Sequence, residues 1–418
     1  MAISNLIIEP TDVFVKYYYK VTEFFVLLGG KITQIPVERI SGIKIENDYD
    51  QAIFPIFRME VTLEPSIYYG ILKEKQTVRF KLRIQKFYKK EGLNDPSLDT
   101  DFINDIFVLF PDEDNVDYER NLKKEGKTDK DLNVLEKVNN VVELFLFKES
   151  VIGLRSKYNT TLTKCDVATA MTHLLERAGV TNVLMSPVEN LTKYNQIPIP
   201  NIHLEKSMRM LNNSYGLYRK GGIIFFGLLR NYILNYRAAC TAFMKNEWKE
   251  TTIVMLDKTN TKSYLSGSFI KKNEKKYYFN ATSDGIDTKQ KSVSNNLISG
   301  VNPNVIDPRL GTVQQMQTKT VTVGQQNAAM IYNTDSNVFW AETMQYQFQA
   351  SSNPVTLVLE DINIEAFEPN KDFSMIFEDP MYSKKFNGKY KLSQSIFTFS
   401  NSGDHFNVAG AFVFMKAE

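Results

Sequence analysis

The chain has 418 residues, and 43% of them are apolar, which is enough to bury several hydrophobic cores in about two to four domains. Its net charge of +2 gives no reason to expect nucleic-acid binding. No apolar run is long enough to cross a membrane, and the first residues lack the basic and apolar regions of a signal peptide. Cys165 and Cys240 are too few for a disulfide framework and indicate a reducing compartment.

The first 90 residues predict a series of short strands. Residues 13–20 and 24–28 form two apolar runs, after which Gly29 and Gly30 predict a turn. Further on, apolar and polar residues alternate with a period of two, which predicts strands with one buried face. These alternating segments are residues 43–45, 57–63 and 78–84. Such a series, in a chain that is 12% aromatic, favours a barrel or a sandwich.

Residues 91–140 interrupt this pattern, because they hold 14 Asp and Glu against 6 Lys and Arg. We interpret them as an acidic insertion in a first barrel, with one short strand at 107–110. Strand character resumes at 141–147. Since an unpaired buried charge costs several kcal/mol, we expect the insertion to face solvent, a basic partner surface or a channel.

The following segment, residues 161–250, predicts a small α+β domain. Thr163 is expected to cap a first helix, with Asp166 completing a capping box, and Gly179 to end that helix. The Ile-Pro-Ile-Pro segment at 197–200 is extended, and Asn201 is expected to cap a second helix.

A hairpin is predicted after the second helix. The apolar runs 215–218 and 223–226 flank a turn that contains Gly221 and Gly222, and residues 232–236 are a third strand. These glycines lie between apolar runs, which is typical of a hairpin turn and not of a phosphate-binding loop.

The remainder of the chain predicts a second β-rich domain. Residues 252–256 and 276–279 are strands, whereas residues 283–335 are rich in Ser, Thr, Asn, Gln and Gly and predict a long polar loop. Residues 340–418 again predict many strands, including 373–377 and a final hairpin whose turn is at 401–404.

The order of these parts resembles the central baseplate hub proteins of contractile-tailed bacteriophages and the hub part of type VI secretion spike proteins. One pattern is Ile-Pro-Ile-Pro, a helix, Tyr-Gly-Leu-Tyr, a glycine turn and an apolar strand. The other is an Asn-Gly-Lys-Tyr strand followed by a hairpin with a strongly apolar last strand. The positions that match are Pro198, Pro200, Tyr215, Gly216, Gly221, Gly222, Asn387, Gly388 and Tyr390. At 368–371 the sequence Glu-Pro-Asn-Lys departs from the Pro-Gly turn frequent in the family, although Asn tolerates the same turn.

The resemblance implies a mainly β fold with a small α+β part. Residues 1–160 and 251–418 would form two tail-tube-like β-barrel domains, with long insertions at 91–140 and 283–339. The α+β domain of two helices and a hairpin, residues 161–250, would be inserted between them.

The resemblance also implies a structural function. The protein would be a homotrimeric symmetry adaptor that joins a sixfold tail tube to a threefold central spike. Its partners would be the tail tube protein, the central spike protein and other baseplate proteins, and genomic DNA would pass through its channel without specific binding. It would be made in the host cytoplasm and reside in the tail baseplate of the virion, with no membrane insertion.

The sequence predicts no catalytic, cofactor-binding or metal-binding residues. His173, His203 and His405 lack the spacing of a zinc site, so we interpret them as surface or packing residues. The acidic segment 112–117 has calcium-like oxygen ligands but lacks the glycine and terminal glutamate of an EF-hand, and we interpret it as a solvated loop.

Two alternatives remain open at this point. A β-rich tail-associated glycan hydrolase would need a solenoid repeat, which we do not find, or a carboxylate-lined cleft, which spacing along a sequence does not report. A receptor-binding or adaptor protein would share the β-rich composition, and the helix-and-hairpin domain between two barrels argues against it.

Overall fold

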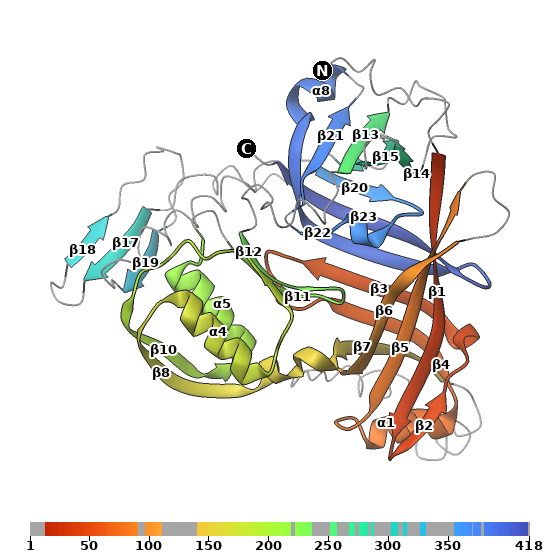
Figure 1. Ribbon diagram of the computed structural model, residues 1–418, viewed down its shortest axis with the longest axis horizontal. Coiled ribbons are helices and arrows are strands. Elements are labelled where there is room, and N and C mark those ends of the chain that lie inside the picture. The colour runs from red at the N-terminus through yellow and green to blue at the C-terminus, as the bar shows by residue number, and fades with distance from the viewer. Residues whose placement is uncertain are drawn as a thin grey trace, which may run out of the picture.

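The structure is a computed structural model of the chain. The residues it describes are 13–90, 97–110, 140–218, 222–235, 251–256, 267–271, 276–282, 286–287, 302–307, 312–315, 327–331, 355–369, 371–377 and 380–416. The chain is mostly β, as the sequence predicts, with a separate α+β region that Figure 1 shows beside the strands.

A first closed ring contains eight strands from both ends of the chain. Its order is β1-β5-β6-β7-β4-β3-β22-β23, and it closes where Tyr19 of β1 pairs with Phe406 of β23. Inward and outward side chains alternate along these strands, so that Phe57 and Met59 are buried while Arg58 between them is only partly covered. The strands are β1 (Val13–Leu28), β3 (Ile40–Asp48), β4 (Ile56–Leu63), β5 (Arg79–Lys90), β6 (Ser97–Leu109), β7 (Asn140–Lys148), β22 (Gly388–Asn401) and β23 (Phe406–Lys416).

A second ring shares three strands with the first. It runs β1-β14-β15-β13-β21-β22-β23 and returns to β1. Strand β22 changes partner along its length: its first residues pair with β21, and those after Ser393 pair with β3. The strands that only this ring contains are β13 (Thr251–Leu256), β14 (Gly267–Lys271), β15 (Lys276–Thr282) and β21 (Phe373–Phe377). Outside the ring, β20 (Val355–Leu359) pairs with β23, and β16 (Ile286–Asp287) pairs with β20 at the edge of the sheet.

Strand pairing corrects several predictions about the barrels. Residues 97–109 are not part of an insertion, because β6 pairs with β5 and β7 and buries Phe102 and Phe107. The predicted strands 13–20 and 24–28 are the single strand β1, which has a register shift between Val21 and Glu23. The rest of the acidic segment, residues 111–139 with the candidate calcium ligands at 112–117, lies outside the described residues.

The inserted domain confirms the two predicted helices and corrects their beginnings. Asp166, not Thr163, caps the first helix, since its Oδ1 accepts a hydrogen bond from the Thr169 backbone N–H at 2.7 Å. Asn201 belongs to a strand, and His203 precedes the second helix without a side-chain cap. The elements are η3 (Glu149–Arg155), β8 (Lys157–Cys165), α4 (Val167–Ala178), β9 (Val183–Met185), β10 (Tyr194–His203), α5 (Leu204–Tyr215), β11 (Gly222–Phe226) and β12 (Asn231–Asn235).

The hairpin of the inserted domain is shifted from its predicted place. Helix α5 ends at Tyr215, and residues 216–218 follow it without forming a strand. Strand β11 pairs instead with β12, around a turn at 227–230. Strand β9 adds to β12 in parallel. Strands β8 and β10 curve around helices α4 and α5 in Figure 1.

The remaining elements are short. A separate three-stranded sheet lies within the predicted polar insertion, and Figure 1 shows it away from the barrels. No helix among the described residues is long and apolar enough to span a membrane. These elements are β2 (Lys31–Gln34), η2 (Val37–Arg39), α1 (Pro65–Lys73), β17 (Asn302–Asp307), β18 (Thr312–Gln315), β19 (Asn327–Ile331), η7 (Ile364–Ala366) and α8 (Pro380–Phe386).

Candidate functional site: the joint between the barrels and the inserted domain

The described residues between β20 and β21, here called the joint loop (360–369 and 371–372), fill the space beside the shared strands. The Tyr19 hydroxyl of β1 donates to the carbonyl of Ile362 at 3.3 Å and accepts from the backbone N–H of Ile364 at 2.9 Å. The ring of Phe367 stacks on that of Phe412, with centroids 4.1 Å apart. The joint loop is therefore part of the barrel core.

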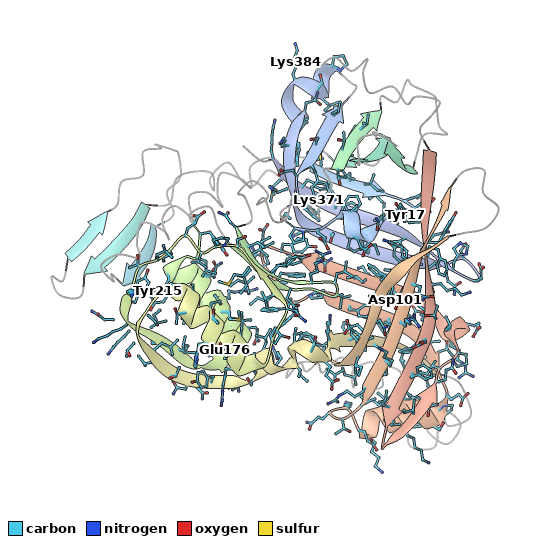
Figure 2. The ribbon with its side chains drawn as sticks, in the orientation of Figure 1. Tyr17, Asp101, Glu176, Tyr215, Lys371 and Lys384 are labelled. Carbon is cyan, nitrogen blue, oxygen red and sulfur yellow. The ribbon has the colours of Figure 1, made fainter. Side chains whose placement is uncertain are left out.

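Two buried lysines tie the joint loop to the barrels, and a third forms a hydrogen bond within the loop. Lys86 of β5 pairs with Glu365, and Lys391 of β22 pairs with Asp372, where Nζ and Oδ1 are 2.6 Å apart. Lys371 donates through Nζ to the carbonyl of Ala366 at 2.9 Å. Since an unpaired buried ammonium is costly, removing one carboxylate would leave a destabilising charge behind. In Figure 2 Lys371 lies between the C-terminal strands and the inserted domain.

The hairpin β11–β12 joins the inserted domain to the barrels. The ring of Phe225 meets that of Tyr49 edge-on, with centroids 4.8 Å apart. The backbone N–H of Phe226 donates to the carbonyl of Ile53 at 2.7 Å. At the hairpin turn, the Gly227 N–H donates to the Arg230 carbonyl at 2.9 Å, where a Cβ on residue 227 would clash. The hairpin is thus bonded to the β3–β4 connection.

Glu368 connects the joint loop to this hairpin. Its carboxyl is buried and lies 3.7 Å from Nε of Arg230. Burial raises the pKa of Glu368 to about 7, against the opposing effects of Arg230, Lys371 and the hydroxyl of Tyr232. Burial likewise raises the pKa of Tyr49.

A cavity of about 40 Å³ lies at this joint, lined in part by Asn47, Tyr49, Tyr232 and Glu368. It has room for water, whereas ligand sites are typically about 300–1,000 Å³. Among the described residues, no group of three His, Cys, Asp or Glu side chains could hold a metal ion. The arrangement is suited to holding two parts of a protein in a fixed orientation.

The first set of sequence-predicted positions lies in the inserted domain, away from the joint. Pro198 and Pro200 are on β10, and Tyr215 and Gly216 end helix α5, where Gly216 has a φ of 71°. Gly222 begins β11, and Gly221 lies outside the described residues. Figure 2 shows Tyr215 on the far side of this domain from Lys371.

The second set lies at the turn from α8 into β22. The Asn387 side chain accepts from the Phe377 N–H at 2.7 Å, and the Tyr390 hydroxyl donates to the Phe386 carbonyl at 2.6 Å. Gly388 has a φ of 151°, a conformation that favours glycine. These residues shape a turn, and the structure does not bring them together with the first set.

The three histidines have local partners. His173 lies 3.2 Å from the Tyr158 hydroxyl, His203 contacts the Arg155 carbonyl, and His405 lies 2.6 Å from Asp404. Each is placed where a packing or surface role accounts for it.

The charged residues of the joint are not predicted from the sequence. Lys86 had a usable signal, because it continues the inward positions Phe80, Leu82 and Ile84 of an alternating strand. Glu368 had none, since its burial depends on a hairpin more than a hundred residues earlier in the chain.

The chain is similar to several solved structures, at low sequence identity. A tail protein from Neisseria meningitidis MC58 has a TM-score of 0.51 at 10% identity, over 96% of this chain and 97% of that one. A 43 kDa tail protein of prophage MuSo2 from Shewanella oneidensis has a TM-score of 0.48 at 10% identity, over 95% and 99%. A chain of the Francisella PdpA–VgrG complex has a TM-score of 0.41 at 10% identity, over 97% of this chain and 52% of that one. No curated protein matches the chain.

The chain thus shares its fold with the tail protein from Neisseria meningitidis. The family model described as the bacteriophage PBS1 gene 109 protein matches residues 4–417, and the chain belongs to that family.

Proposed function

We propose that the chain is the hub subunit of a phage tail, a homotrimer that joins the sixfold tail tube to the threefold central spike. The observation that carries this proposal is the presence of two closed strand rings in one chain. A trimer of such subunits has six rings around one threefold axis. It therefore matches sixfold symmetry on one side and threefold symmetry on the other.

The shared strands support an adaptor function. Because β1, β22 and β23 belong to both rings, the two rings cannot turn independently of each other. The joint loop and the hairpin β11–β12 add a bonded connection to the inserted domain. A subunit that transmits force between a tube and a spike needs such fixed geometry.

Partners and location follow from the same proposal. The tail tube protein, the central spike protein and other baseplate proteins are the expected contacts, and genomic DNA passes through the channel without specific binding. The virion baseplate is the expected location after synthesis in the host cytoplasm, with no membrane insertion.

The oligomeric state tests the proposal. We expect light scattering to give three times the 48.1 kDa chain mass, for the protein alone or mixed with the tube and spike proteins of the same phage. Electron microscopy of labelled particles should place it between tube and spike. A monomer in every mixture would contradict the trimer, and label at the fibre tips would favour a receptor-binding protein.

The function we propose is structural and not enzymatic. The cavity at the joint is too small for a sugar, and the proposal assigns no catalytic residue. We expect no clearing of peptidoglycan or polysaccharide in a zymogram. Clearing above a heat-inactivated control would instead favour the hydrolase.

A further inference from the structure

Glu368 lies at the contact between two parts of the molecule. It belongs to the joint loop, which is packed in the barrel core, and faces the tip of the hairpin β11–β12 from the inserted domain. Its side chain is 8% exposed, while that of Arg230, its partner across the contact, is 40% exposed. A separation of hairpin and loop would therefore bring the carboxyl into water.

The charged and titratable groups around Glu368 come from three elements. The hairpin contributes Arg230 and Tyr232, the joint loop contributes Glu365 and Lys371, and the β3–β4 connection contributes Tyr49. Lys371 also bonds the Ala366 carbonyl, and Glu365 pairs with Lys86. Arg230, Lys371 and Tyr232 only partly compensate a charge on Glu368, and Glu365 opposes it, so the pKa of the carboxyl stays raised to about 7.

The cavity beside Glu368 is part of the same contact. It is lined by the hairpin, by the joint loop and by β3, so both sides of the contact border it. Its small volume gives an ionised carboxylate little hydration while the contact is closed. Opening of the contact is the way for the charged form to gain hydration.

We propose that Glu368 is a proton-controlled latch between the inserted domain and the barrels. With its carboxyl protonated, the hairpin stays closed on the joint loop. When the carboxyl loses its proton, the hairpin and the loop separate more often. The orientation of the inserted domain is therefore held more firmly in mildly acidic than in alkaline solution.

The sign of this pH dependence follows from proton linkage. The closed contact raises the pKa of Glu368 from the usual 4.5 to about 7, so it binds the proton more tightly than the open contact does. The contribution of Glu368 to the stability of the closed contact is fully present below about pH 4.5 and is lost as the pH rises to about 7.

Hydrogen exchange of the hairpin and joint-loop peptides, read by mass spectrometry, tests the latch. After correction for the intrinsic exchange rate, we expect exchange to be more than about tenfold faster at about pH 8 than at about pH 5.5. Each unit of pKa difference changes the opening equilibrium constant by up to about tenfold. Equal protection at both pH values would overturn the proposal. The measurement does not depend on the oligomeric state, so it is separate from the test of the hub function.

Variants assign the effect to this carboxyl. Glu368→Gln is neutral at every pH and should keep the acidic level of protection with no pH dependence. Arg230→Gln removes a compensating charge and should open more than the wild type at about pH 8, with little change at about pH 5.5.

Arg209→Gln is the matched control. Arg209 also crosses to the barrel side, where it bonds the carbonyl of Gln51, but its partner does not titrate. Its loss should lower protection equally at both pH values. If Glu368→Gln keeps the pH dependence of the wild type, or if Arg230→Gln behaves like Arg209→Gln, the latch does not exist.

Discussion

The barrels are stabilised mainly by contacts between residues far apart in the sequence, whereas the inserted domain is stabilised mainly by contacts within its own segment. The barrel core is rich in aromatic rings, and its first ring closes only when Tyr19 near the start meets Phe406 near the end. The core of the inserted domain is mainly aliphatic, and most of it comes from residues 151–233. Contacts between distant residues carry a larger loop-closure cost and form slowly. The barrels therefore depend on the whole chain, whereas the inserted domain depends mostly on its own segment.

A substitution in the barrel core should have the largest effect. Phe80 on β5 is fully buried and stacks on Phe24, with ring centroids 6.1 Å apart. Phe80→Ala should lower the free energy of unfolding by about 3–5 kcal/mol, because it loses buried area and leaves a cavity. Chemical denaturation followed by circular dichroism measures this loss. Lys81→Ala, on the next outward-facing residue, should change stability by less than about 0.5 kcal/mol, and equal losses would contradict the assigned register.

Removing a buried polar side chain from the inserted domain should have a smaller and more local effect on stability. Asn190 is fully buried and its amide donates to the Tyr194 hydroxyl at 3.0 Å and to the carbonyls of Tyr215 and Gly216 at 2.9 Å each. Asn190→Ala leaves these carbonyls unsatisfied and should cost about 1–3 kcal/mol.

Hydrogen exchange measures whether the loss of stability stays within the inserted domain. The amides of α5 should lose protection in Asn190→Ala while those of β4 and β5 keep theirs. Asn195→Ala, at an exposed position on β10, is the control and should leave both unchanged. An equal loss in the barrels would show that the two regions unfold as one unit.

Removing the N-cap of helix α4 should cause the next largest loss of stability. Asp166→Ala removes the acceptor of the Thr169 N–H and should destabilise the inserted domain by about 0.5–2 kcal/mol. Thr163→Ala should have almost no effect, although the sequence predicts Thr163 as the cap. Thermal unfolding of the two variants compares them directly, and a larger loss in Thr163→Ala would contradict the cap geometry.

The strands that the sequence divides in two share one physical cause. In β1 the register shifts between Val21 and Glu23, and in β22 it shifts between Leu392 and Gln394. A bulge adds one residue to a strand and so breaks the period of two by which a strand is recognised. The sequence therefore predicts separate strands on each side of Thr22 and Ser393, where the chain is in fact continuous.

Local patterns were otherwise sufficient for most elements. The sequence predicts helices α4 and α5, the Gly29–Gly30 turn and strands β3, β4, β5 and β7, because their signals lie within a few residues. It does not predict helices α1 and α8. The closure of the first ring by β22 and β23 could not be predicted, since it pairs the end of the chain with its beginning. The charged joint depends on the same closure. Division into domains 1–160, 161–250 and 251–418 stays a prediction, with the qualification that the barrels share strands.

Residues 111–131 of the acidic segment are expected to matter less for the fold than strand β6, which precedes them. Deletion of residues 111–131, closed by a short Gly/Ser linker, removes 8 acidic and 5 basic residues from between β6 and β7. The register permits this. Phe110 bonds to Phe145 and β7 begins at Asn140, so the linker and residues 132–139 need to span only about 17 Å, at 3.3 Å per residue. We expect an unchanged oligomeric state and a melting temperature that falls by no more than about a few degrees, since loop length has a weak effect on stability. An insoluble or monomeric variant in light scattering would show that residues 111–131 are structural, as β6 is.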